Sequence, residues 1–204
     1  KQSIRNLGQV ANAPRVIIYN FMPVLDWVRT DLQYTLPDGA RTLYFDQTQF
    51  AAFEMLILKR AGAAKDYSAD QCARAEAYFK TLSADQVENL KRSIIDNFPG
   101  FKGVTIEDVR RMLGRYDGVS RAQLEDNLRN FLAAVTPVAE ENGCRMAIHP
   151  DDPPRSILGL PRIFSNLADI KRLLADVDSP ANDICFCTGS FSAGTPIRHD
   201  GLAL

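Results

Sequence analysis

Apolar residues recur along this chain with two spacings, the alternation of strands and the 3.6-residue period of helices. Short runs rich in β-branched, aromatic or sulfur-containing residues predict strands over 15–21, 145–149 and 183–187. Apolar stripes at helical spacing predict a long helix over 120–142 and a second helix over 165–177. The order helix–strand–helix–strand is typical of a parallel sheet covered by helices, so the sequence predicts an α/β fold.

Polar residues mark the ends of the predicted helices. Capping boxes, in which a Ser or Thr stands three positions before a Gln or Asp, are expected to begin four helices, at Ser68, Ser83, Thr105 and Ser120. Gly143 should end the long helix. Ser165 is expected to cap the second helix, which should bury Leu167 and Leu174.

The segment 31–119 looks like an insertion in the α/β pattern. It holds a predicted hairpin, whose strands over 33–36 and 40–45 flank the turn Pro37-Asp38-Gly39, followed by helices. A strand-to-helix connection usually takes about 2–6 residues, so this segment is far longer than a loop. We expect a hairpin and helical subdomain that covers the site as a lid or makes a subunit contact. The alternative is a helical domain with no part in the chemistry.

Two residues at predicted strand ends carry the candidate chemistry. His149 ends one strand and precedes a proline-rich acidic loop, and Cys187 ends the next strand, on the same face as Cys185. Imidazole and thiolate together suit a divalent transition metal better than Mg²⁺ or Ca²⁺. If both bind one ion, the imidazole nitrogen and Sγ should lie roughly 3.5–4 Å apart. The alternative is a core histidine beside buried cysteines.

Composition excludes several other classes of protein. The chain has 204 residues, 46% of them hydrophobic and 24% charged, which is ordinary for a globular protein. A net charge of −1 gives no surface suited to nucleic acid or an anionic membrane, and no run of about 18 apolar residues predicts a membrane span. The four cysteines lack the spacing of a disulfide framework, which favours the reducing cytoplasm.

Seven stretches carry a resemblance that extends over nearly the whole chain. They are residues 19–27, 29–31, 45–47, 51–55, 149–155, 158–162 and 187–190. In this order they resemble the mannonate dehydratase family. The resemblance implies a (β/α)8 TIM barrel, of which 1–204 would be part of one domain, incomplete in this chain and with the large helical insertion after an early strand. It also implies dehydration of D-mannonate to 2-keto-3-deoxy-D-gluconate in hexuronate catabolism, by a homo-oligomer.

The resemblance further implies a divalent metal, Mn²⁺ in first place and Fe²⁺ as the alternative. His149 and Cys187 match two of its ligands, while a second His and an Asp come from later strands in the family. We interpret His199 as an exposed loop residue, since no predicted strand precedes it. Because only three barrel strands can be counted against the eight that closure needs, we expect a central piece of a longer enzyme, inactive by itself.

Four polar residues near the predicted strand ends are candidates for supporting roles. Arg155 is expected to bind the substrate carboxylate through two hydrogen bonds, or else to pair with Asp151 or Asp152. Asn20 would bond a substrate hydroxyl or cap its loop. The two aspartates either orient His149 or cap the proline-rich turn.

Two other classes of function remain open at this point. A metal-dependent sugar isomerase or epimerase of the xylose-isomerase-like barrel type would use a similar metal and the same strand-end histidine. A structural or interaction protein would simply bury the histidine and the cysteines.

Overall fold

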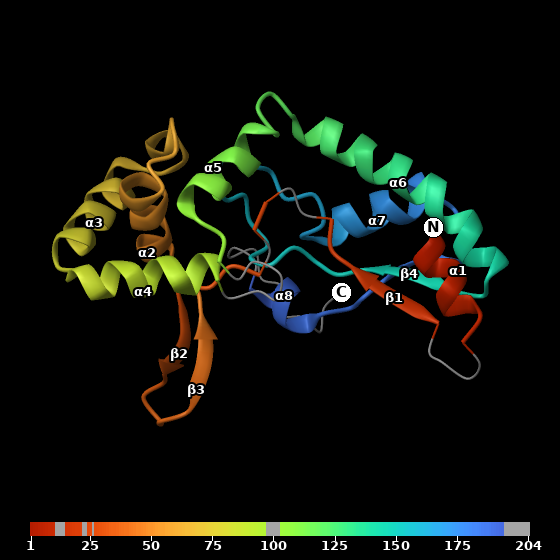
Figure 1. Ribbon diagram of the computed structural model, residues 1–204, viewed down its shortest axis with the longest axis horizontal. Coiled ribbons are helices and arrows are strands. Elements are labelled where there is room, and N and C mark those ends of the chain that lie inside the picture. The colour runs from red at the N-terminus through yellow and green to blue at the C-terminus, as the bar shows by residue number, and fades with distance from the viewer. Residues whose placement is uncertain (11–14, 22–23, 26, 97–102, 194–204) are drawn as a thin grey trace. The chain divides into compact units, whose positions relative to one another are not determined.

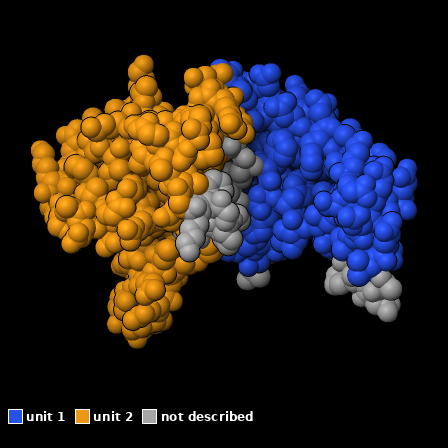
Figure 2. Space-filling view, viewed as in Figure 1, with its two compact units in different colours: residues 1–22, 118–156, 161–204 blue, residues 23–117, 157–160 orange. Residues whose placement is uncertain are grey.

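The computed structural model describes residues 1–10, 15–21, 24–25, 27–96 and 103–193. The chain divides into two compact units (Figure 2). Unit 1 comprises residues 1–22, 118–156 and 161–204, and unit 2 comprises residues 23–117 and 157–160. The expected insertion over 31–119 falls almost entirely within unit 2, which begins earlier and also takes in 157–160. A role of unit 2 as a lid stays a prediction.

Unit 1 contains a parallel three-stranded sheet in the order β1-β4-β5 (Figure 1). Its strands are β1 (Val16–Tyr19), β4 (Arg145–Ile148) and β5 (Asn182–Ile184). Its helices are α1 (Gln2–Gly8), α6 (Arg121–Glu141), α7 (Leu167–Asp176) and α8 (Thr188–Ser192). Because α6 packs on β4 and α7 on β5, the predicted α/β fold with parallel strands is confirmed.

The middle strand and α6 form the core of unit 1. Met146, Ala147 and Ile148 are all buried, since β4 has a strand on each side. Facing them, α6 buries the predicted apolar stripe, which includes Leu124, Leu128, Leu132, Val135 and Val138. The edge strand differs, because Val16 and Ile18 are 49% and 61% exposed. The face of β1 that carries them has no apolar cover within the described residues.

Several features of unit 1 differ from the predictions. β5 ends at Ile184, before Cys187, because Cys187 already begins α8 as its N-cap. Asn166, not Ser165, caps α7. Leu167 and Leu174 are 39% and 42% exposed, and the buried face of α7 is formed by Ile170, Leu173 and Asp169. Ser120 caps α6 through the Gln123 N–H, but the reciprocal bond of a capping box is not formed.

Unit 2 is built from a hairpin and short helices. Strands β2 (Asp31–Thr35) and β3 (Arg41–Tyr44) pair antiparallel as predicted. The helices that follow are α2 (Gln47–Ala52), a π-helical turn η1 (Phe53–Ile57), a 3-10 turn η2 (Ala63–Asp66), α3 (Ala69–Lys80), α4 (Ala84–Ile95) and α5 (Ile106–Gly114). The predicted capping boxes at Ser68, Ser83 and Thr105 are confirmed. Its core includes Phe50, Phe53, Leu58 and Ile94, together with Ile157, Leu158 and Leu160.

Substitution of Asn166 tests the corrected start of α7. Its side-chain oxygen accepts a hydrogen bond from the Asp169 N–H at 3.0 Å. We expect Asn166→Ala to lower the free energy of unfolding by about 1 kcal/mol, and Asn166→Gly by only a few tenths, because glycine is tolerated at the N-cap. Urea denaturation of the two variants measures the difference. Equal losses would contradict the capping role.

Candidate functional site

Three candidate residues, Asn20, His149 and Cys187, follow strand ends on one edge of the unit 1 sheet. Asn20 comes directly after β1 and is exposed, and His149 comes directly after β4. The His149 N–H donates to the Tyr19 carbonyl at 2.8 Å, so the pairing of β1 with β4 continues to this edge. Likewise the Cys185 N–H donates to the Ile148 carbonyl at 2.8 Å. The carboxyl ends of all three strands therefore lie side by side.

His149 is half-buried, and one of its ring nitrogens contacts a backbone carbonyl. Its Nδ1 lies 2.8 Å from the carbonyl oxygen of Pro150. A carbonyl oxygen only accepts hydrogen bonds, so Nδ1 carries the proton and donates it. In a neutral ring with this contact the lone pair is on Nε2, which is the arrangement of histidines that bind metals through that nitrogen.

Two thiols follow β5, and they have different surroundings. The register Ile148↔Ile184 brings Cys185 opposite His149, with Cys187 two residues further on. Cys187 is the N-cap of α8, and the hydroxyl of the buried Ser190 donates to its Sγ at 3.3 Å. Burial, followed by the charge of Cys187, raises the pKa of the Cys185 thiol. Because a hydrogen-bond donor on sulfur stabilises a thiolate, this contact favours Cys187 over Cys185 as the predicted metal ligand.

The loop after His149 is closed by Asp151, which is 3% exposed. Its Oδ2 accepts from the Phe164 N–H at 2.7 Å and from the Ser165 hydroxyl at 3.0 Å. Its own N–H donates to the Phe164 carbonyl at 2.9 Å. We refer to these three hydrogen bonds as the Asp151 clasp. Of the roles considered for Asp151, they support closure of the proline-rich loop, whose half-buried Arg155 lies between the two ends.

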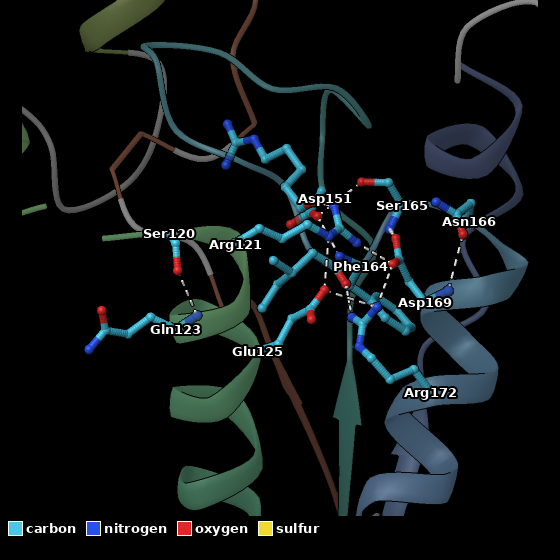
Figure 3. A network of polar contacts seen from close by, with 12 residues as sticks. Ser120, Arg121, Gln123, Glu125, Asp151, Phe164, Ser165, Asn166, Asp169 and Arg172 are labelled. Atoms are coloured by element: carbon cyan, nitrogen blue, oxygen red, sulfur yellow. Dashed lines mark hydrogen bonds and ion pairs between the residues drawn. The ribbon is translucent and has the colours of Figure 1, made fainter. Parts of the chain in front are cut away.

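An ionic cluster around one buried carboxylate adjoins the clasp (Figure 3). Asp169, with a side chain only 2% exposed, pairs with Arg121 and Arg172, and Arg121 also pairs with Glu125. Sequence reasoning missed this cluster. The helical spacings of Arg121 with Glu125 and of Asp169 with Arg172 were its available signals. The pairing between helices depends on how α6 and α7 pack, which local spacing does not report.

The metal ligands that the sequence predicts are tested only in part by the structure. Among the residues that the structure describes, no group of three or more His, Cys, Asp or Glu side chains is arranged to hold a metal ion. The role of His149 and Cys187 as metal ligands stays a prediction. His199 lies outside the described residues, as do Met22, Pro23 and Asp26 of the 19–27 motif.

No helix in the described part of the chain is both long and apolar enough to cross a membrane.

Known proteins that resemble this chain point to one family. The model of the D-mannonate dehydratase family matches residues 1–197. A mannonate dehydratase of Marinomonas sp. (strain MWYL1) is 49% identical over 94% of this chain, and one of Chromohalobacter salexigens is 46% identical over 97%. A crystal structure of mannonate dehydratase from Streptococcus suis serotype 2 superposes with a TM-score of 0.60 at 32% identity, over 94% of this chain and 40% of that one.

The matches cover nearly all of this chain but only part of its relatives. The chain spans about half the length of the two relatives, 49% and 50% respectively. The match to the family model runs through both units and includes the loops after β4 and β5. It gives no support to the alternative of a sugar isomerase. The chain belongs to the D-mannonate dehydratase family.

Proposed function

We propose that the protein to which this chain belongs dehydrates D-mannonate to 2-keto-3-deoxy-D-gluconate in hexuronate catabolism. The proposal rests on family membership together with one structural observation. His149, with its lone pair on Nε2, and Cys187, with a hydroxyl donor on its sulfur, follow adjacent parallel strands. We further propose that the β1-β4-β5 sheet is part of a (β/α)8 barrel, in which strand carboxyl ends carry the active site. All four cysteines are free thiols, which supports a cytoplasmic enzyme.

The donor set of this edge fits a divalent transition metal. One imidazole nitrogen and one thiolate favour Mn²⁺, Fe²⁺ or Zn²⁺ over Mg²⁺, and we propose Mn²⁺, with Fe²⁺ as the alternative. His149 and Cys187 would hold the ion, and the Pro150 carbonyl and Ser190 hydroxyl would orient these two ligands. When bound, the metal supplies Lewis acidity toward the negative charge that develops beside the substrate carboxylate.

Two further residues would bind the substrate itself. Loss of water from mannonate removes the proton next to the carboxylate and expels the hydroxyl on the next carbon with a second proton. A guanidinium in the loop after β4, that of Arg155, would hold the carboxylate through two hydrogen bonds while this occurs. Asn20, exposed at the end of β1, would bond a substrate hydroxyl. Holding the substrate at two points fixes the reacting bonds in place.

Product analysis tests the proposal. The full-length enzyme, loaded with Mn²⁺, should convert D-mannonate into a 2-keto-3-deoxy acid that absorbs after reaction with semicarbazide. A sample stripped with a chelator should be inactive and should recover on addition of Mn²⁺. Consumption of mannonate without keto-acid formation would instead indicate an isomerase or epimerase, and the proposed function would be wrong.

Substitution of Arg155 tests the carboxylate contact. We expect Arg155→Lys in the full-length enzyme to raise the KM for D-mannonate about tenfold, because one charge-assisted hydrogen bond contributes about 1.5–3 kcal/mol and lysine cannot replace the paired geometry. Arg145→Lys is the matched control. Arg145 lies at the amino end of β4, the end opposite to the loop that carries Arg155, and it pairs with Asp183 there. An unchanged KM in Arg155→Lys, or equal effects in both variants, would contradict the assignment.

A further inference from the structure

In the loop between β4 and α7, charged side chains form hydrogen bonds with the backbone of residues 162–165 (Figure 3). The Arg162 carbonyl accepts from Arg121, and the Ile163 carbonyl accepts from Arg172. The same two guanidiniums pair with Asp169, whose other oxygen accepts from the Ser165 N–H at 2.9 Å. The backbone of 162–165 is thus tied to α6 and α7.

The Asp151 clasp joins this held segment to the start of the loop. Its three hydrogen bonds connect Asp151 with Phe164 and Ser165, 13 and 14 positions further along the chain. His149 stands two residues before the clasp, and Arg155 four residues after it. The clasp therefore closes the stretch that carries Arg155, a proposed substrate-binding residue, and it holds the chain directly after His149, a proposed metal ligand.

Burial strengthens the hydrogen bonds of the clasp. Asp151 is 3% exposed and Phe164 is 1% exposed, so water does not compete well for these groups. A carboxylate that accepts from a backbone N–H and a hydroxyl makes charge-assisted bonds, which are shorter and stronger than neutral ones. Removal of the carboxylate leaves the Phe164 N–H buried without this partner.

We propose that Asp151 is a positioning residue, which keeps the 149–155 stretch in the conformation that binds metal and substrate. The proposal rests on the proposed function for the roles of His149 and Arg155. Without the clasp the loop populates other conformations, and the apparent dissociation constant of a ligand rises as the binding-competent fraction falls. A fall of that fraction to about one tenth raises the Kd for Mn²⁺ about tenfold, and it raises the KM for D-mannonate to the same extent when Mn²⁺ is kept well below that Kd. At saturation both ligands restore the bound conformation, so kcat changes little.

The experiment compares Asp151→Ala, Asp151→Asn and wild type in the full-length enzyme. Mn²⁺ binding is measured by electron paramagnetic resonance without substrate, KM and kcat by keto-acid formation, and exchange of the Phe164 amide by hydrogen–deuterium exchange. We expect Asp151→Ala to raise the Kd for Mn²⁺, and the KM measured at Mn²⁺ well below that Kd, about tenfold each, with kcat within about threefold and faster exchange at Phe164. Asp151→Asn keeps an acceptor oxygen and should show a smaller rise in both constants. If Asp151→Ala fails to fold, Asp151→Asn and Ser165→Ala, which removes one bond of the clasp, provide the comparison.

A matched control separates positioning from loss of stability. Asn182 is buried at the amino end of β5, where its side chain donates to the Leu173 and Val177 carbonyls. Asn182→Ala should lower the melting temperature and leave both binding constants within about twofold of wild type, since unfolding outside the loop does not change the competent fraction of folded molecules. Unchanged constants in Asp151→Ala, or equal shifts in Asn182→Ala, would overturn the proposal. Absence of keto acid from wild type would contradict the proposed function alone, because Mn²⁺ binding and amide exchange still test the clasp.

Discussion

Replacement of His149 by alanine in the full-length enzyme is expected to lower Mn²⁺ affinity and kcat/KM together, each by more than about a hundredfold. Even loss of a group that only orients a ligand costs about 10–100-fold in metal affinity or activity, and His149 is proposed to be a ligand itself. Its Nδ1 contacts the Pro150 carbonyl, so Nε2 is the ring nitrogen proposed to bind the metal, and alanine removes it with the rest of the ring. Metal content per chain and steady-state kinetics measure the two effects.

The chain supplies its own control for this substitution. It contains two histidines, and the second, His199, follows no predicted strand. His199→Ala should keep the metal content and activity of the wild type within about threefold, as expected for a residue outside a metal site. Retention of one bound ion per chain in His149→Ala, or its loss in His199→Ala, would contradict the assignment of the ligand.

Cys187→Ser is expected to have the second large effect, a joint loss of metal occupancy and activity of more than about a hundredfold. A serine hydroxyl stays protonated at neutral pH and is a poor ligand compared with a thiolate. The Ser190 hydroxyl, which donates to the Cys187 sulfur, would be left beside a neutral oxygen. Metal analysis after extensive dialysis and a Mn²⁺ titration of activity measure the loss.

Cys185→Ser is the matched comparison, because it makes the same chemical change two residues away. Cys185 is partly buried and lies opposite His149 in the β4–β5 register, so its loss should reduce stability while most of the bound metal stays in place. A reversed order of effects, with metal lost in Cys185→Ser and kept in Cys187→Ser, would show that the neighbouring thiol is the ligand.

Local sequence patterns predicted the elements of this fold well. The hairpin over β2 and β3 follows from its turn residues, and the helix starts at Ser68, Ser83 and Thr105 follow from side chains within three positions of one another. The parallel pairing of β1, β4 and β5 follows from the helices between them. Each of these signals lies within a few residues of the structure that it specifies.

The errors arose where distant parts of the chain decide the local structure. Ser165 was predicted as the cap of α7, but its hydroxyl donates to Asp151 and its N–H to Asp169, and Asn166 takes the cap instead. Leu174 fits a buried helical stripe by spacing, yet it is 42% exposed, while the polar Asp169 is buried between Arg121 and Arg172. Local periodicity does not reveal such an ion pair between helices.

The candidate site was likewise predicted where it depends on local sequence, and missed where it depends on distant residues. The positions of His149 and Cys187 after adjacent strands were predictable from apolar runs that end in polar residues. The Asp151 clasp was not, because it connects residues 13 and 14 positions apart through a loop with no periodic pattern. The tautomer of His149 likewise depends on the Pro150 carbonyl, whose direction only the folded loop determines.

X-ray absorption spectroscopy of the full-length enzyme loaded with Zn²⁺ tests the central claim most directly, that His149 and Cys187 hold one metal ion at the carboxyl ends of β4 and β5. The account predicts one sulfur neighbour at about 2.3 Å together with nitrogen and oxygen neighbours at about 2.0–2.2 Å. The sulfur neighbour should persist in Cys185→Ser and disappear in Cys187→Ser. A wild-type spectrum with no sulfur neighbour, or a sulfur neighbour that survives in Cys187→Ser, would contradict the account.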